Sequence, residues 1–149
     1  MRGEPLRILL VEDNEDHAEA VKRSFRKHKL RNHIVHLTDG ESALDFLLGR
    51  GEHDWSKTRL RPHLVILDLR LPRVDGLEVL KVIKQTDELK RMPVIILTSS
   101  KAETDIARAY DYRANSYVVK PLDFEKFVGL MKDLGFYWLA WNVNSYPET

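Results

Sequence analysis

Residues 64–76 read Leu-Val-Ile-Leu-Asp-Leu-Arg-Leu-Pro-Arg-Val-Asp-Gly, and this stretch decides the fold. It begins with an unbroken apolar run at 64–67, which is too short for a typical helix. Such a run is typical of a strand that is buried on both faces of a parallel sheet. Asp68 follows the strand directly, and Asp75 is placed to cap a helix, with Glu78 three residues further on. The stretch therefore predicts a buried strand, a polar turn and a helix, in that order.

Four more apolar runs lie at 6–11, 33–37, 93–97 and 116–119. The segments between and after the runs repeat apolar residues every three or four positions, which predicts amphipathic helices. Their predicted core positions are Ala18, Val21 and Phe25; Ala43, Leu44 and Leu47; Leu77, Leu80 and Ile83; Ala102, Ile106 and Ala109; and Phe124, Phe127, Val128, Met131 and Leu134. Strands that alternate with helices predict an α/β fold. We expect the flavodoxin-like form: a doubly wound five-stranded parallel sheet with strand order 2-1-3-4-5 and five helices.

The length and composition fit one globular domain, expected over 1–134, followed by a short helical, aromatic extension at 135–149. Lys and Arg together number 24 and Asp and Glu 23, so the overall charge does not favour binding to nucleic acid or to an anionic membrane. The sequence has no cysteine, which excludes disulfides, cysteine zinc sites and thiol catalysis. No apolar run approaches the ~18 residues that a membrane span needs, so we expect a cytoplasmic protein.

Polar residues gather at the predicted carboxyl ends of the strands, where open α/β sheets bind their ligands. Glu12 and Asp13 follow the first strand, Asp68 the third, Thr98 the fourth and Lys120 the fifth. At ~5 Å and an effective dielectric constant near 20, each pair of carboxylates would repel by about 3 kcal/mol, so the site needs a cation. Oxygen ligands of this kind favour Mg²⁺. A carboxylate nucleophile beside a metal and a lysine suits phosphoryl transfer.

Each of these residues also has a plain structural interpretation. An aspartate after a strand is usually a turn residue or a helix cap, and an acidic pair is usually the solvated start of a helix. Their arrival together at one edge is what favours a site. Other sites are not indicated: no glycine-rich loop follows the first strand, and His33 and His36 face opposite sides of their strand, which argues against a zinc site.

The chain resembles the receiver domains of two-component response regulators. The matching motifs are ILLVEDNED at 8–16, LVILDLRLPRVDG at 64–76, VIILTSS at 94–100 and NSYVVKP at 115–121. The resemblance implies that Asp68 is the phosphoacceptor. It also implies that Asp13 ligates Mg²⁺ directly, that Glu12 does so through water, and that the backbone carbonyl of Arg70 completes the protein ligands.

Further roles are implied by the same resemblance. Lys120 would pair with Asp68 or the phosphoryl group, Thr98 would close on a phosphoryl oxygen, and Tyr117 would turn inward as it does so. The bond between Lys120 and Pro121 would be cis.

Two positions leave alternatives open. Arg70 could shield the phosphoryl group from water, or pair in solvent with Glu15 or Asp16. The fourth helix must end without the glycine that is common in the family, at Arg113 or Asn115, and asparagine tolerates the left-handed conformation better.

The resemblance implies a single-domain regulator, without an output domain, that accepts its phosphoryl group from a histidine kinase. Short stretches at 50–52, 114–117 and 136–138 resemble the small regulators paired with bacterial phytochromes. One alternative is a phosphorylation-independent scaffold with a receiver fold. A second is an aspartate-nucleophile phosphatase, which is disfavoured because such enzymes place a second aspartate two residues after the nucleophile, where Arg70 stands here.

We also expect a homodimer that is built on the fourth helix, fifth strand, fifth helix and C-terminal tail. Leu130, Tyr137 and Trp141 share a helical face outside the predicted core, and exposed aromatic residues mark interfaces.

Overall fold

The computed structural model describes residues 6–26, 32–50 and 61–133, and these ranges contain one parallel sheet. Its strands are β1 (Leu6–Val11), β2 (Asn32–Leu37), β3 (Leu64–Leu67), β4 (Val94–Thr98) and β5 (Ser116–Val119). They are ordered β2-β1-β3-β4-β5 and all pair in parallel. The flavodoxin-like sheet predicted from the sequence is confirmed, and β1, β3 and β5 have the predicted bounds.

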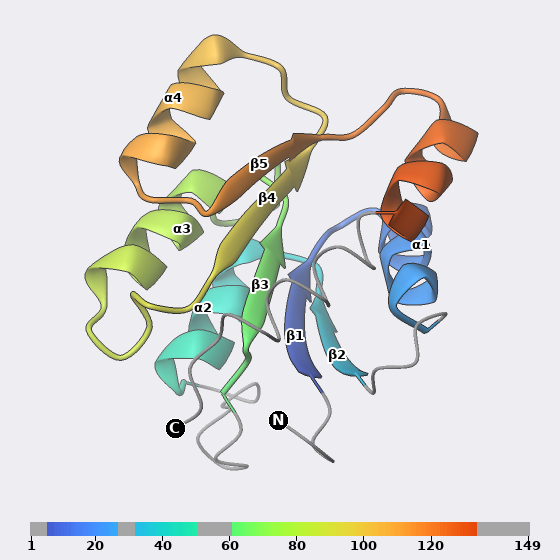
Figure 1. The fold of residues 1–149 in the computed structure, drawn as a ribbon. Coiled ribbons are helices and arrows are strands. Elements are labelled where there is room, and N and C mark those ends of the chain that lie inside the picture. Colours follow the sequence, from blue (N-terminus) through green and yellow to red (C-terminus); the bar gives the residue numbers. More distant parts are fainter. Residues whose placement is uncertain (1–5, 27–31, 51–60, 134–149) are drawn as a thin grey trace.

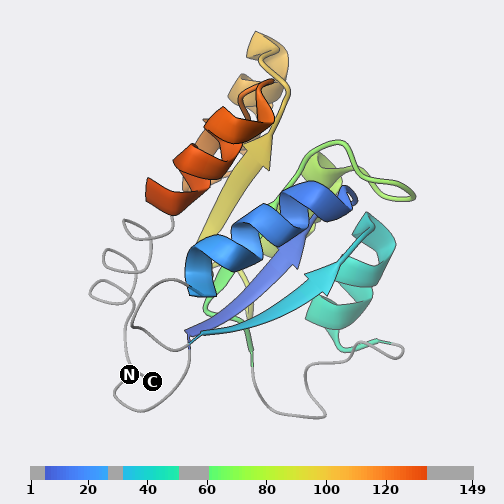
Figure 2. The same ribbon diagram turned by 90° about the vertical axis from the view of Figure 1, so that its right-hand side faces the viewer.

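Helices cover both faces of the sheet (Figure 1). On one face lie α2 (Gly40–Leu48), α3 (Gly76–Gln85) and α4 (Glu103–Asp111). On the other face α1 (Glu15–Arg26) lies beside a fifth helix at 124–133, as Figure 2 shows. Among the described helices, none offers an apolar stretch of the length that a membrane span requires.

Alternation of side chains along the strands builds two separate cores. Leu9, Val65 and Ile96 point toward α2, α3 and α4, whereas their neighbours point toward α1 and the helix at 124–133. On the second side, Ala18, Val21 and Phe25 of α1 pack with Phe127 and Met131. The central strands are therefore buried on both faces, which explains their unbroken apolar runs.

Aspartate side chains cap the starts of several helices, and the cap that the sequence predicted at Asp75 is confirmed. The Asp75 carboxylate accepts a hydrogen bond from the Leu77 amide (2.8 Å) at the start of α3. Asp123 accepts from the Glu125 and Lys126 amides at the start of the helix at 124–133. These side chains satisfy amide groups that have no partner within the helix.

The end of α4 differs from the expectation that favoured asparagine. Arg113 adopts the left-handed conformation, with φ of 69°. The Asn115 side chain is committed elsewhere, because its carbonyl oxygen accepts from the Val94 amide (2.8 Å) and from Lys84 Nζ (3.2 Å). Asn115 therefore joins the beginnings of β4 and β5 rather than ending the helix.

Three expectations about the chain after β5 need correction. Phe124 was predicted to be buried, but it is 49% exposed, because it is the first residue of its helix and packs beside the His17 ring. Leu130 was predicted to belong to a free face, but it packs partly against the core on the α1 side. The Lys120–Pro121 peptide bond is trans, not cis, which is the ordinary preference of X–Pro bonds. Leu134, Tyr137 and Trp141 lie outside the described residues.

Candidate functional site

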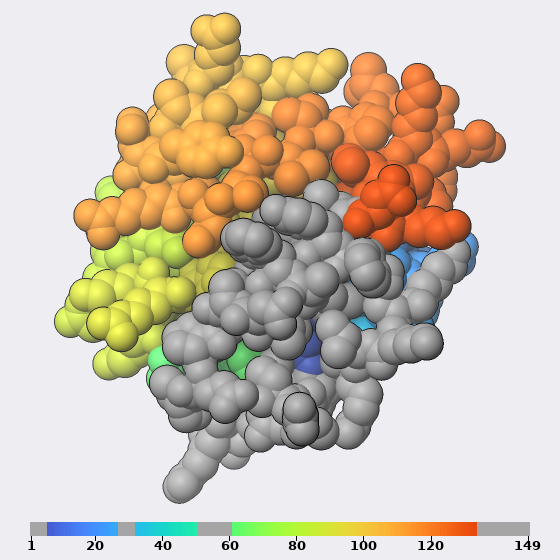
Figure 3. All heavy atoms as spheres, in the orientation of Figure 1, coloured from blue at the N-terminus to red at the C-terminus, as the bar shows by residue number. Residues whose placement is uncertain are grey.

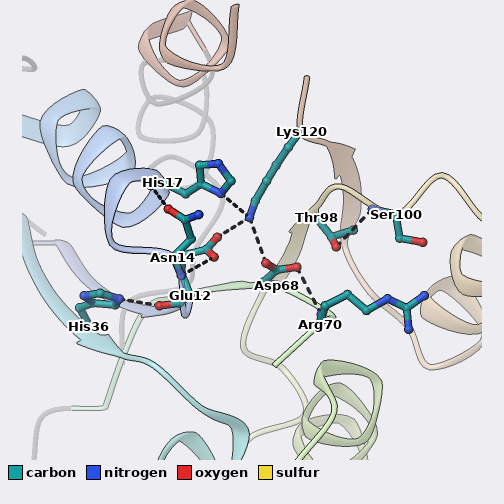
Figure 4. A network of polar contacts seen from close by, with 9 residues as sticks. All are labelled: Glu12, Asn14, His17, His36, Asp68, Arg70, Thr98, Ser100 and Lys120. Atoms are coloured by element: carbon teal, nitrogen blue, oxygen red, sulfur yellow. Dashed lines mark hydrogen bonds and ion pairs between the residues drawn. The ribbon is translucent and has the colours of Figure 1, made fainter. Parts of the chain in front are cut away.

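Polar side chains from the ends of β1, β3 and β5 meet at the carboxyl edge of the sheet (Figure 4). Lys120 Nζ lies 2.6 Å from Glu12 Oε1 and 3.0 Å from Asp68 Oδ2. All three side chains are at least nine-tenths buried, with exposed fractions of 4% for Lys120, 2% for Glu12 and 8% for Asp68. Buried ions persist only when they are paired, so each of these groups depends on the others.

The turn after β3 fixes the position of Asp68. The Asp68 amide donates to the Val11 carbonyl (3.1 Å), and the Gly76 amide donates to the Leu69 carbonyl (2.9 Å). A Cβ atom at Gly76 would lie only 2.2 Å from the Asp68 carbonyl oxygen. Glycine at this position therefore allows the start of α3 to pack directly against the turn that carries Asp68.

Three carboxylates form a cluster that suits a hard divalent cation. Glu12, Asp13 and Asp68 each offer one oxygen, and these atoms lie within 4.8 Å of one another. Glu12 and Asp68 are buried whereas Asp13 is exposed, so the cluster is reachable from solvent. One lysine cannot neutralise three carboxylates, and the excess negative charge and the oxygen donors fit Mg²⁺ or a similar ion.

Titration of the site follows from its burial. Burial, with a further contribution from the Asp68 charge, raises the pKa of Glu12 to about 7, although Lys120 opposes the shift. His17, which the sequence analysis did not single out, places Nδ1 3.1 Å from Lys120 Nζ. Burial and the Lys120 charge lower the pKa of His17, so the ring stays neutral and its Nδ1 can accept a hydrogen bond from the Lys120 ammonium group.

The raised pKa of Glu12 predicts a pH-dependent stability of the metal-free protein. A raised pKa in the folded state means that the native protein binds the proton more tightly than the unfolded chain does. We therefore expect the Glu12 contribution to the free energy of unfolding to fall as pH rises from about 4.5 to about 7, on the order of 3 kcal/mol in total. Chemical denaturation in EDTA across this range measures it. Glu12→Gln should remove this part of the slope, and an unchanged slope would contradict the assignment.

Thr98 at the end of β4 and Tyr117 in β5 each contact Ser100 in the turn after β4. Thr98 is fully buried, and its hydroxyl oxygen faces the Ser100 amide at 3.4 Å. The Tyr117 hydroxyl donates to the Ser100 carbonyl (2.9 Å) and is partly buried. The two residues that the resemblance implied as a switch thus share one neighbour, Ser100, which the sequence analysis missed.

Arg70 has a partner that the sequence analysis did not predict. Its Nη2 atom lies 2.6 Å from Asp105 Oδ2 on α4, so of the two alternatives for Arg70 the pairing with Glu15 or Asp16 is wrong. The reason is the path of the chain after β4, which brings the first turn of α4 over the turn after β3. Asp105 lies seven residues after Thr98 in a segment without strand or motif signal, and nothing in the sequence marks it as part of the site.

Comparison with known proteins supports one family. Residues 8–132 match the response regulator receiver domain, a signalling domain. The probable methanogenesis regulatory protein FilR2 of Methanothrix harundinacea is 43% identical over 97% of this chain and 90% of its own length. Response regulator Rcp1 of Synechocystis is 36% identical over 91% of this chain and 90% of its own length.

Solved structures agree in the fold and over the same length. The Mn²⁺-bound form of Rcp1 superposes with a TM-score of 0.85, covering 91% of this chain and 95% of that one. The phosphorylated cyanobacterial phytochrome response regulator RcpA, 34% identical, also gives 0.85, covering 92% and 96%. Because the family model covers residues 8–132 and both curated relatives are more than 30% identical over at least nine-tenths of the chain, this chain belongs to the response regulator receiver domain family.

Proposed function

We propose that the chain is a single-domain response regulator that accepts a phosphoryl group on Asp68 from a histidine kinase. The observation that carries this proposal is the buried contact of Lys120 with both Asp68 and Glu12, beside an acidic cluster that is open to solvent through Asp13. A structural aspartate would need no buried cation and no neighbouring acids. The arrangement is instead suited to neutralising negative charge that arrives from outside.

The geometry suggests how Asp68 would react. Lys120 donates to Oδ2, whereas among the described residues Oδ1 has one long contact of 3.4 Å, from the Arg70 amide. Oδ1 is therefore the oxygen better placed to attack phosphorus. A phosphorus–oxygen bond forms, the phosphorus–nitrogen bond of the kinase phosphohistidine breaks, and its electron pair returns to the imidazole. Catalysis of this kind rests on positioning and charge neutralisation.

A divalent cation completes the proposed site. Glu12, Asp13, Asp68 and the backbone carbonyl of Arg70 would hold Mg²⁺, which when bound neutralises charge on the phosphoryl oxygens. Lys120 would move from Asp68 to the new phosphoryl oxygens or bridge both. Thr98 would donate its hydroxyl to a phosphoryl oxygen, and Tyr117 would report that change at the surface of β5.

The kinase partner is proposed from the relatives. RcpA is a phytochrome response regulator, which supports a phytochrome-type histidine kinase as the donor. FilR2 carries a name that refers to methanogenesis, so the sensory input can differ within the group. The sequence has no cysteine, which fits the reducing cytoplasm, where ATP is available to a histidine kinase.

Uptake from acetyl phosphate tests the proposal without the kinase. We expect intact-mass spectrometry to show one added phosphoryl group in millimolar Mg²⁺ and none in excess EDTA. The melting temperature should also rise with Mg²⁺, because the folded state alone holds the ion. Two results together would favour a scaffold with a receiver fold instead. The protein would gain no phosphoryl group in Mg²⁺, and neither acetyl phosphate nor Mg²⁺ would raise its melting temperature.

A homodimer is the proposed form in which the signal is passed on. Figure 3 shows α4, β5 and the helix at 124–133 adjoining one another on one face, and Tyr110 of α4 is 51% exposed. We propose that residues 1–134 form the receiver domain and that 135–149 extend this face as a clasp. Light scattering should give a dimeric mass for the full chain and a weaker dimer after truncation at Leu134. A full-length protein that stays monomeric at high micromolar concentration, phosphorylated or not, would reject the dimer.

A further inference from the structure

Arg70 joins the turn of the proposed phosphoacceptor to the first turn of α4. Its backbone amide lies 3.4 Å from Asp68 Oδ1, while its guanidinium Nη2 lies 2.6 Å from Asp105 Oδ2. The arginine side chain is 60% exposed, but that of Asp105 is only 11% exposed. An exposed cation is thus tied to a buried carboxylate, two residues from the residue that would carry the phosphoryl group.

Asp105 has a second partner that belongs to the same region. The Ser100 hydroxyl donates to Asp105 Oδ2 (2.6 Å), and the Ser100 carbonyl accepts from the Tyr117 hydroxyl (2.9 Å). Asp105 also stands in the first turn of α4, where the helix dipole favours an acid. The residue at the cap position, Ala102, makes no side-chain hydrogen bond that would fix the start of α4.

We propose that Arg70 is a second cationic contact for the phosphoryl group, and that it exchanges Asp105 for that group when Asp68 is phosphorylated. This inference rests on the proposed function. Phosphorylation converts the Asp68 carboxylate into a group with more negative charge and three strong acceptor oxygens. Arginine matches such oxygens with its planar set of donors, and the backbone of Arg70 already lies beside Asp68.

The exchange has a consequence for α4. Without Arg70, the buried Asp105 carboxylate keeps the Ser100 hydroxyl as its one side-chain partner among the described residues, and an uncompensated buried charge is costly. The start of α4 must then move so that Asp105 reaches water. Because Ser100 also holds Tyr117, the same movement reaches the surface of β5. Asp105 and the phosphoryl group therefore compete for Arg70. This competition gives rise to a coupling free energy between the phosphoryl site and α4.

Beryllofluoride, a stable phosphoryl mimic, measures the competition at saturating Mg²⁺. Arg70→Gln should weaken its binding about tenfold, because a charge-assisted contact is lost. Asp105→Asn should strengthen binding about fivefold, since Arg70 no longer has a competing carboxylate, whereas asparagine can still accept from Ser100. In the double variant, Asp105→Asn should change the affinity less than twofold, because there is no arginine to release.

Whether the effects of Arg70→Gln and Asp105→Asn on beryllofluoride affinity are additive distinguishes competition for Arg70 from a general electrostatic effect of the Asp105 charge. Removal of a nearby negative charge would strengthen anion binding with or without Arg70, and would therefore give additive effects. Glu103→Gln removes an exposed acid from the same turn of α4, and Arg73→Gln removes an exposed arginine that pairs with Glu41. Both controls should change the affinity less than twofold. If Asp105→Asn fails to fold, Asp105→Ala replaces it, with melting temperature as the check.

Amide hydrogen exchange tests whether the Arg70–Asp105 ion pair is released on ligand binding. If the pair were purely structural, beryllofluoride would not change the exchange rate at the start of α4. Beryllofluoride should speed exchange of the Ile106 amide, which bonds to the Ala102 carbonyl at the start of α4, in the wild type but not in Arg70→Gln. Additive affinity effects, or acceleration that persists in Arg70→Gln, would overturn the inference while leaving the proposed function intact. A wild-type protein that binds no beryllofluoride and accepts no phosphoryl group would overturn both.

Discussion

Asp68→Asn is expected to abolish phosphoryl uptake from acetyl phosphate, with no residual mass gain. Asparagine has nearly the same shape, so the variant should fold, but its amide oxygen is a poor nucleophile and carries no charge for Lys120 to hold. The buried contact between Lys120 and Asp68 at 3.0 Å becomes an ion–dipole contact, while Glu12 keeps Lys120 paired. Stability in metal-free buffer should therefore change little, because the variant also removes one of three mutually repelling carboxylates.

Asp87→Asn is the matched control for this change. Asp87 has a side chain that is 91% exposed and pairs only at the surface with Lys90, so uptake should stay at the wild-type level. Intact-mass spectrometry at equal protein and donor concentration compares the two variants. Phosphorylation of Asp68→Asn at wild-type stoichiometry would show that another residue is the acceptor.

Replacement of Lys120 with methionine is expected to have the second-largest effect, on both stability and uptake. Its ammonium is the cation that touches Glu12 and Asp68, and its loss leaves buried carboxylates facing each other. Breaking a buried pair in this way costs roughly 3–5 kcal/mol. The rate of uptake should fall about 100-fold or more, the usual size of the loss when a charge-stabilising group is removed from an active site.

Lys101→Met controls for the loss of one positive charge near the site. Lys101 is exposed in the turn between β4 and α4, and its replacement should change neither stability nor uptake by a measurable amount. If Lys120→Met unfolds in EDTA, millimolar Mg²⁺ should restore the fold, because the same carboxylates bind the ion. A Lys120→Met protein with wild-type stability and uptake would remove the basis for the proposed site.

The sheet and the outline of the site could be predicted because both follow from short-range patterns. Runs buried on two faces give the strands, and the rule that parallel strands end at one edge brings Glu12, Asp68 and Lys120 together. Two helices and two strands lie between Asp68 and Lys120 along the chain, yet the positions of the strand ends alone predict that this pair is in contact.

The details that the sequence could not supply depend on where loops and helix ends settle. Phe124 has the spacing of a core residue, but it stands at the first position of its helix and remains half exposed. Asn115 has the better propensity for a left-handed helix end, but its amide is used to join two strands, and Arg113 takes that conformation instead. Asp105 meets Arg70 only because the turn after β4 carries α4 across the site. Each outcome is decided by tertiary contacts that outweigh local preference.

Reduction of the phosphorylated protein with borohydride, followed by fragment mass spectrometry, locates the phosphoryl group directly. Acyl phosphates are reduced to alcohols, so a phosphorylated aspartate is converted to homoserine. After treatment with acetyl phosphate and Mg²⁺, we predict homoserine at position 68 and at no other aspartate. Phosphoryl uptake with Asp68 left intact, and homoserine at Asp13 or a phosphoryl group on His17 instead, would contradict the central claim.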